Sequence, residues 1–271
     1  NILYALDIPV WLFAHSPNTH NPYIASLRAI WTRLLWDCRK SAYVSRRKLS
    51  KLRNKNLGQK VVILCNGPSL NKVDFKKLEH VSTIALNKFN LKKTEGGFIP
   101  DFLVAVNDLV IKQNKVFFEC TDIPVFLSHR AISSVKAKEH ITFIHSSGLD
   151  AFAEDCSMSI SDGYTVTYVA LQLAFHLGFS KVALVGCDHS YVFSGKPNEK
   201  SIMAADDPNH FNKDYFGNGL EWHNPDLLES ERSYLLAKKT FGEAGRILVN
   251  CTDGGDLVIF PRARLDDFLE S

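Results

Sequence analysis

The chain has 271 residues, of which 45% are hydrophobic and 23% charged, and this composition is typical of a globular protein with a substantial core. Its net charge of +3 is too small to indicate nucleic acid as a partner. No run approaches eighteen uninterrupted apolar residues, so the sequence predicts no transmembrane helix. The chain begins with Asn1 rather than Met, which leaves open a preceding segment, including a signal sequence.

The cysteines indicate a reducing compartment. Six of them are scattered along the chain without CxxC spacing, at positions 38, 65, 120, 156, 187 and 251. We expect free thiols and therefore a cytoplasmic protein. A zinc site needs clustered ligands, which this spacing does not provide, so no metal site is predicted from the cysteines.

Residues 1–57 form the first of two predicted regions. Five apolar residues recur at helical spacing, namely Leu27, Ile30, Trp31, Leu34 and Leu35. Between Arg28 and Lys55 there are ten Lys or Arg residues and one acid, Asp37. We favour a helix that packs against the main domain and keeps its basic face in solvent. The alternative is a helix near anionic lipid headgroups or an acidic partner, at the inner face of the membrane.

Residues 58–271 form the second region, in which short apolar runs alternate with helical patterns. Strands are predicted at Val61–Cys65, Thr83–Leu86, Phe102–Val106, Val125–Leu127, Thr142–Ile144, Val182–Val185 and Ile247–Val249. Helices are predicted at Thr165–Leu177, which Gly178 would end, and at Leu227–Ala244. This order predicts an α/β fold with a mostly parallel, Rossmann-like sheet flanked by helices.

The segment Asn66-Gly67-Pro68-Ser69 follows the first predicted strand. Gly67 permits close approach of a ligand to the backbone, and Pro68 fixes the turn. Ser69 would cap a helix whose free N–H groups favour phosphate. The segment matches neither GxGxxG nor the P-loop pattern, and a plain strand-to-helix turn is an equal interpretation.

Polar residues also follow three later strands. Asn87 follows the second, Asn107-Asp108 the third, and Asp188-His189 the strand at 182–185. Ligands of such sheets bind at the carboxyl ends of the strands, and an amide offers both donors and an acceptor to a nucleotide. Turn residues, and for Asp188-His189 a structural pair, are the alternatives.

Residues of about 190–225 have the composition of a lid. The segment is long, irregular and rich in His and aromatic residues, including His210, Tyr215 and His223. Either histidine could act as a general base when the lid closes, or merely fill hydrogen bonds. The pair Asp206-Asp207 suggests metal binding only weakly. Near the C-terminus, Arg262 or Arg264 could pair with a phosphate, although a solvated basic end is favoured.

The order of several motifs resembles a known family. The motifs are NGPSL, ALNKFN, GYTVTYVALQLAFHLGFSKVALVGCDHSY, DDPNHFNKDYFG, WHNP and FPRARL, over roughly residues 58–268. They resemble the DUF115, or 6-hydroxymethylpterin diphosphokinase MptE-like, family. They are also similar to the bacterial sialyltransferases of glycosyltransferase family 42, which open with a similar strand and NGPSL loop.

The sialyltransferase resemblance implies a GT-A-type domain that binds a CMP-linked donor under a lid. By motif, donor contacts fall on Asn66, Asn87 and Asn107, and loosely on the segment Gly163-Tyr164-Thr165. The catalytic base falls on His223 rather than His210, although WHNP replaces the expected G-H-S context.

The MptE-like resemblance implies instead ATP-dependent diphosphoryl transfer to a pterin, with magnesium held by Asp108, Asp188 or Asp207. We favour a glycosyltransferase that moves a sugar, sialic acid or a related CMP-linked sugar, from a nucleotide donor to a cell-surface glycan. His223, His210, Asp188 and His189 are its catalytic candidates. No cofactor is required by this prediction, magnesium belongs to the alternative, and a homo-oligomer is left open.

Overall fold

Seven parallel strands form the centre of the molecule. The computed structural model describes residues 21–92, 94, 97–203, 206–217 and 219–271. The strands of the main sheet are β1 Lys60–Leu64, β2 Ser82–Leu86, β3 Phe102–Ala105, β4 Val125–Ser128, β5 Ile141–Ile144, β6 Lys181–Val185 and β9 Ile247–Asn250. All seven predicted strands are confirmed, each within two residues at its ends.

The sheet has the order β5-β4-β3-β2-β1-β6-β9, and every pairing is parallel. The chain proceeds outward from β1 to β5 and then returns to place β6 on the other side of β1. The topological switch point therefore lies between β1 and β6, and ligands of this fold class bind beside that point. The predicted Rossmann-like α/β fold is confirmed.

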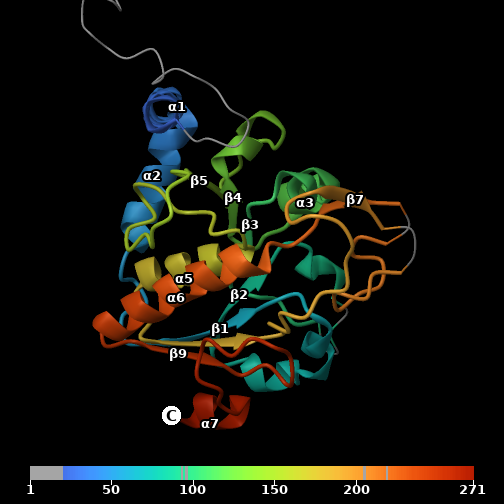
Figure 1. The fold of residues 1–271 in the computed structure, drawn as a ribbon. Coiled ribbons are helices and arrows are strands. Elements are labelled where there is room, and N and C mark those ends of the chain that lie inside the picture. The colour runs from blue at the N-terminus through green and yellow to red at the C-terminus, as the bar shows by residue number, and fades with distance from the viewer. Residues whose placement is uncertain (1–20, 93, 95–96, 204–205, 218) are drawn as a thin grey trace, which may run out of the picture.

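Helices cover both faces of the sheet. The α-helices are α1 Pro22–Asp37, α2 Lys40–Leu52, α3 Asp108–Gln113, α4 Lys115–Cys120, α5 Val166–Leu177, α6 Leu227–Glu243 and α7 Leu265–Glu270. Both α5 and α6 lie on one face (Figure 1). Alternate residues of β1 point to opposite cores, so Val61 and Ile63 pack with α5 and α6 while Val62 and Leu64 pack on the other face.

The local sequence explains the central helix. Almost every residue of α5 is buried, because the helix is covered by the sheet, by α6 beside it and by the segment around Phe152. Thr165 caps its first turn by accepting a hydrogen bond from the Thr167 N–H, and Gly178 ends it with φ +94°. The predicted start and end of this helix are confirmed.

The helix α2 is part of the α/β domain. It packs along β5, the edge strand, where the Ser45 hydroxyl accepts a hydrogen bond from the Phe143 N–H at 3.0 Å. The Lys48 ammonium donates to the carbonyl of Ile141 at 3.2 Å. These side chains satisfy backbone groups that an edge strand otherwise leaves open.

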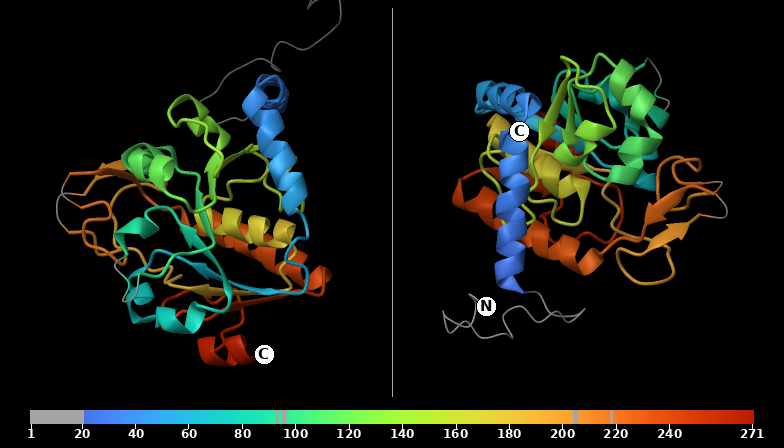
Figure 2. Two further views of the ribbon diagram at one scale, coloured as in Figure 1. Left: turned by 180° about the vertical axis from the view of Figure 1, so that it is seen from behind. Right: turned by 90° about the horizontal axis from the view of Figure 1, so that it is seen from above.

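The helix α1 does not pack as predicted. Its apolar residues Leu27, Ile30, Trp31, Leu34 and Leu35 are all exposed, so the expectation that they face the main domain is wrong. The opposite side of the helix is attached instead, through Trp36, which is buried, and Arg33, which donates to the carbonyl of Met158. The helix lies along the outside of the molecule (Figure 2).

The predicted lid is an irregular segment with one small hairpin, formed by β7 Lys200–Ile202 and β8 Glu221–His223. It folds over the carboxyl edge of the sheet and is fixed to the loop after β1. The Phe211 N–H donates to the carbonyl of Asn66 at 2.9 Å, and the Asn71 amide donates to the carbonyl of Phe211 at 2.8 Å. These two hydrogen bonds therefore join residue 211 of the lid segment to the loop after β1.

Candidate functional site

A cleft with two adjoining chambers lies at the carboxyl edge of the sheet, below the lid. The narrow chamber, of about 80 Å³, is lined by the loops after β1 and β6, including Asn66, Gly67 and Asp188. The wider chamber, of about 430 Å³, is lined by residues that include Asn107, Arg130, Asp162, Tyr164 and His223. Both chambers share Asn87, Thr165, Val166, Tyr191 and His210 in their walls.

The loop after β1 is held by the loop after β6. The Asp188 carboxylate accepts hydrogen bonds from the Ser69 hydroxyl at 2.7 Å and from the Ser69 N–H at 3.3 Å. A Cβ on Gly67 would lie 1.9 Å from Asp188 Oδ2, so only glycine fits at this position. Asp188 therefore fixes the shape of the NGPS loop.

Ser69 does not cap a helix or offer a free phosphate site, in contrast to the prediction. It lies inside the short 3₁₀ helix Pro68–Lys72, whose first residue is Pro68, and it is buried. Its N–H and hydroxyl both donate to Asp188, so a carboxylate already occupies the place where a phosphate would bind.

Two amides in the narrow chamber have unused acceptors. The Oδ1 atoms of Asn66 and Asn87 are buried and have no hydrogen-bond partner among the described residues. Asn87 also adopts φ +51°, a left-handed conformation that few side chains tolerate, while its N–H donates to the carbonyl of Val104. Unsatisfied buried acceptors in a cleft indicate a ligand that donates hydrogen bonds.

In the lid, His210 is oriented by a carboxylate. Its Nδ1 lies 2.8 Å from Asp207 Oδ2, and the imidazole stacks on the Tyr215 ring, with centroids 4.1 Å apart and planes at 4°. Because the carboxylate accepts from Nδ1–H, the neutral ring leaves its lone pair on Nε2. His210 lines both chambers, so this nitrogen is the one available to a substrate.

Asp207 is fully engaged by protein donors. Burial raises the pKa of its carboxyl, but the hydrogen bonds from His210 and from the N–H groups of Asn209 and Phe216 outweigh this and lower the pKa below its ordinary value. The carboxylate therefore stays ionised, as an orienting group for His210 requires.

Lys88 fixes the lid to the end of β2. Its ammonium donates to the Tyr215 carbonyl and to Gln113 Oε1, each at 2.6 Å, and lies 4.5 Å from the centre of the Phe216 ring. The Lys88 N–H donates to the Tyr215 hydroxyl at 3.3 Å. Burial lowers the pKa of Lys88 to about 8.

His223 is differently arranged. Its Nδ1 lies 3.4 Å from Asn107 Nδ2, and the Asn107 Oδ1 atom is already occupied as an acceptor from Leu109 and Val110 at the start of α3. If the amide donates to Nδ1, the neutral imidazole of His223 carries its proton on Nε2. Such a ring can donate a hydrogen bond to a ligand but cannot accept a proton there.

The predicted segment Gly163-Tyr164-Thr165 lies in the cleft wall. Gly163 and Tyr164 have φ of +55° and +60°. Thr165 is the N-cap of α5, and both Thr165 and Val166 line the two chambers, so the amino end of this helix faces both of them. Beside it, Arg130 donates to Asp162 at 3.1 Å.

Three predicted candidates are paired with other groups of the protein. The Asp108 carboxylate lies 3.4 Å from Arg130 Nε, His189 Nε2 lies 3.1 Å from Glu231, and Arg262 donates to the carbonyls of Thr252 and Gly255. His189 still borders the narrow chamber. Arg262 stabilises a turn and does not line the cleft.

Some cleft residues were missed from the sequence. Arg130 and Asp162 line the wider chamber and lie outside the motifs of the sequence analysis. Lys88 lines neither chamber but holds the lid, and it belongs to the motif ALNKFN, in which only Asn87 is a predicted site residue. The metal role predicted for Asp207 leaves its spacing unused: it lies three residues before His210, and this spacing is a signal for a carboxylate–imidazole pair. The described residues contain no group of three His, Cys, Asp or Glu side chains placed to hold a metal ion.

A pair of neighbouring histidines, His129 and His145, lies near the cleft, at the ends of β4 and β5. The His129 and His145 rings have centroids 4.5 Å apart, and Trp36 of α1 packs against both. Both nitrogens of His145 and the Trp36 Nε1 are buried with no partner among the described residues. Burial lowers the pKa of His145 to about 4, with a smaller contribution from His129.

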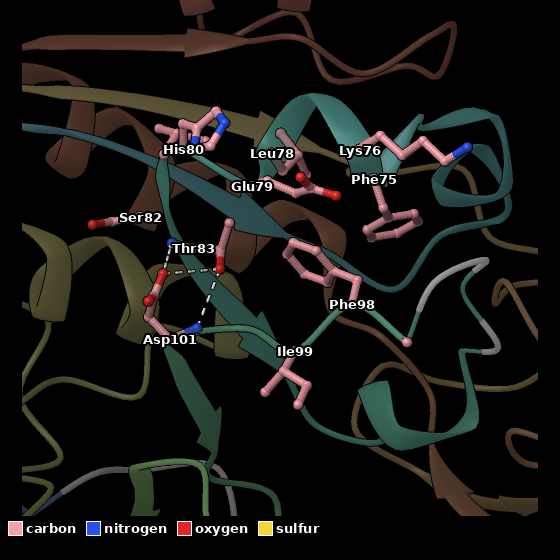
Figure 3. Close-up of a pocket in the computed structure, with 12 residues that line it drawn as sticks. Phe75, Lys76, Leu78, Glu79, His80, Ser82, Thr83, Phe98, Ile99 and Asp101 are labelled. Atoms are coloured by element: carbon pink, nitrogen blue, oxygen red, sulfur yellow. Dashed lines mark hydrogen bonds between the residues drawn. The ribbon is translucent and has the colours of Figure 1, made fainter.

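Another hollow, of about 590 Å³, lies at the opposite edge of the sheet (Figure 3). It is near the starts of β2 and β3, and its Asp101 carboxylate accepts from both the N–H and the hydroxyl of Thr83. Because ligands of parallel sheets bind at the carboxyl ends of the strands, we place the candidate site in the two-chambered cleft.

The fold and the position of the cleft define the Rossmann-like class of α/β proteins. Within this class, the family model described as 6-hydroxymethylpterin diphosphokinase MptE-like matches residues 39–193. The match covers more than half of the chain, so the chain belongs to this family. It includes α2, which the motif resemblance from residue 58 onward omitted.

No curated protein matches the chain. Among solved structures, the sialyltransferase CstII from Campylobacter jejuni, in complex with the substrate analogue cytidine-5'-monophosphate, is similar in fold. The two share 14% sequence identity with a TM-score of 0.41, over 76% of this chain and 85% of that one. This similarity is too distant to transfer functional residues between the two chains.

Proposed function

We propose that this protein is a glycosyltransferase that uses a nucleotide-linked sugar, with His210 as the general base. The observation that carries the proposal is the His210–Asp207 pair, which faces a cleft whose Asn66 and Asn87 amides have unused acceptors. The resemblance of the motif order to family 42 sialyltransferases makes a CMP-linked sugar the first donor to test.

The nucleotide would bind where the two chambers meet. The Oδ1 atoms of Asn66 and Asn87 would accept hydrogen bonds from ribose hydroxyls or a base amino group. The donor phosphate would lie at the amino end of α5, beside Thr165 and Val166, since this end of a twelve-residue helix faces both chambers.

His210 would then accept the proton of the acceptor hydroxyl at Nε2. The acceptor oxygen forms a bond to the anomeric carbon, while the bond from that carbon to the phosphate oxygen breaks and the phosphate keeps the electron pair. Asp207 would stabilise the imidazolium that forms. His223 would hold the acceptor or the sugar through Nε2–H rather than act as the base.

The family description supports a second candidate, diphosphoryl transfer from ATP to a pterin. Asp108, Asp188 and Asp207 would be the magnesium ligands. We rank this candidate second because Asp188 and Asp207 already accept two or more hydrogen bonds each from the protein, so binding a metal would require these bonds to break.

Thermal-shift measurements with CMP, UDP, GDP and ATP, each with EDTA or with Mg²⁺, distinguish the two. We expect stabilisation by CMP in EDTA, and we expect Asn66→Ala or Asn87→Ala to abolish the shift. Asn90→Ala is the matched control, because Asn90 is exposed and lines neither chamber. Stabilisation by ATP with Mg²⁺ alone would contradict the glycosyltransferase proposal.

A further inference from the structure

The helix α1 has a continuous apolar stripe with no partner among the described residues. Its members are six side chains at helical spacing, each about half to two-thirds exposed: Tyr23, Leu27, Ile30, Trp31, Leu34 and Leu35. A helix of sixteen residues is about 24 Å long, and the stripe extends over most of it. An apolar surface of this extent on a folded protein indicates an interaction site.

The helix is held so that this stripe faces outward. Trp36, on the opposite side of α1, is buried against His129 and His145, and Arg33 on a flank bonds to the Met158 carbonyl. Figure 1 shows α1 end-on at the extremity of the molecule, and Figure 2 shows it lengthwise there. A flat surface could therefore contact the whole stripe without touching the sheet.

The charges around the stripe determine the partner. Exposed basic residues follow it on the helix and in the start of α2, among them Arg28, Arg39 and Lys40. The only acid between residues 28 and 55 is Asp37, and its carboxylate is already paired with Arg33 at 2.8 Å and Arg46 at 3.0 Å. Within residues 28–55, the surface beside the stripe is therefore strongly basic.

This charge pattern decides between a membrane and a second copy of the chain. A symmetric dimer through α1 would bring the same basic residues of two copies together, and residues 28–55 supply no unpaired acid to compensate them. An anionic bilayer supplies both an apolar layer for the stripe and negative headgroups for the flanking cations. Trp31 and Tyr23 are also side chains that favour the membrane interface.

We propose that α1 is an in-plane membrane anchor that binds anionic lipid bilayers through this stripe. No helix within the described part of the chain is long and apolar enough to cross a bilayer, so the proposed contact is with one leaflet. The proposal does not depend on the reaction assigned to the cleft.

The test is sedimentation with vesicles of phosphatidylcholine and phosphatidylglycerol, compared with phosphatidylcholine alone, using the full chain. We expect binding to the anionic vesicles that weakens on raising the salt concentration. The variant Leu27→Ser/Leu34→Ser should reduce the partition coefficient at least tenfold, because two apolar side chains leave the bilayer. The variant Arg28→Gln/Lys40→Gln should also reduce it, by roughly tenfold or more.

The chain offers a matched control. Leu228 and Leu235 on α6 are 61% and 55% exposed and seven residues apart, as are Leu27 and Leu34 at 66% and 52%. Leu228→Ser/Leu235→Ser should therefore leave vesicle binding unchanged, with circular dichroism confirming that both variants fold.

Three results would overturn the proposal. One is equal binding of the wild type and the α1 variant to anionic vesicles, which would place the contact elsewhere. Another is equal binding of the wild type to neutral and anionic vesicles. The third is a dimer in multi-angle light scattering that the α1 variant alone converts to a monomer, since a second copy would then cover the stripe.

Discussion

Two groups of histidine and aromatic side chains lie near the carboxyl edge of the sheet, one around His210 and one around His145. They differ in the hydrogen-bond partners of these two histidines. His210 stacks on Tyr215 and has a buried carboxylate on Nδ1, and it faces the cleft. His145 packs at a tilt against His129 and Trp36, has no hydrogen-bond partner on either nitrogen among the residues the structure describes, and lines neither chamber. Both are largely buried.

This difference shows that burial and aromatic contact do not by themselves make a histidine chemically useful. The carboxylate fixes the tautomer of His210 and would stabilise its charged form. For His145, the attraction of Asp37 and Asp162 does not outweigh the cost of burying a charge, so its pKa is lowered. We expect the first group to control turnover and the second to control only stability.

The largest expected effect is on His210. Replacing it by Gln should lower kcat roughly 10²- to 10⁴-fold, because the proton acceptor is lost while the fold is kept. His223→Gln should cost only about tenfold, as expected for loss of one hydrogen bond to substrate. Steady-state kinetics with the donor identified by thermal shift measures both. A large loss in His223→Gln with an active His210→Gln would reverse the assignment.

Asp207→Asn should have the next largest effect, a fall in kcat of roughly 10²-fold with little change in KM for the donor. The amide cannot stabilise the imidazolium, so the pH dependence of kcat should also move relative to the wild type. Asp206→Asn is the matched control, because Asp206 is exposed and its ion pair with Lys213 spans 4.0 Å. If both variants behave alike, Asp207 does not orient His210.

Lys88→Met tests whether the hydrogen bonds of Lys88 hold the lid, and with it His210, over the cleft. The methionine retains most of the apolar volume but loses the hydrogen bonds to the Tyr215 carbonyl and Gln113. We expect a fall in kcat of roughly tenfold and faster cleavage within residues 190–225 by limited proteolysis. Lys92→Met, in a half-exposed position near the lid, is the comparison, and equal cleavage rates in the two variants would contradict the anchoring role.

The smallest effect on turnover should come from the group around His145, whose expected contribution is to stability. The folded-state pKa of His145 is about 4, below its ordinary value of 6.5, so the unfolded chain binds more protons between these values. The free energy of unfolding should therefore fall as pH decreases from 7.5 to 5, by roughly 1–2 kcal/mol for this residue. Urea unfolding of wild type and His145→Phe measures it, and an equal pH dependence in both would exclude His145 as a source.

The sheet could be predicted from the sequence because each strand is a short, buried apolar run between turn residues. The apolar run of β1 and the caps of α5 are local signals, and the structure confirms them. The placement of Asn66 and Asn87 in one cleft followed from the rule that parallel strands end at one edge.

Contacts between distant segments could not be predicted in this way. Nothing near Ser69 in the sequence indicates that Asp188, 119 residues later, would occupy its donors. Nor does the helical spacing of Leu27 and Leu34 reveal which side of α1 meets the domain, because the orientation is set by distant contacts of Trp36 and Arg33. Amphipathic spacing identifies a helix with an apolar face but does not identify what covers that face.

The contact of α2 with β5 has a practical consequence for producing the protein. A chain started at residue 58, where the motif resemblance begins, would lack Ser45 and Lys48 and would expose the edge of β5 with its apolar side chains Ile141 and Phe143. Such an edge pairs readily with other chains, so this truncation should yield insoluble material. Expression of the isolated α/β domain should retain at least residues 39–57.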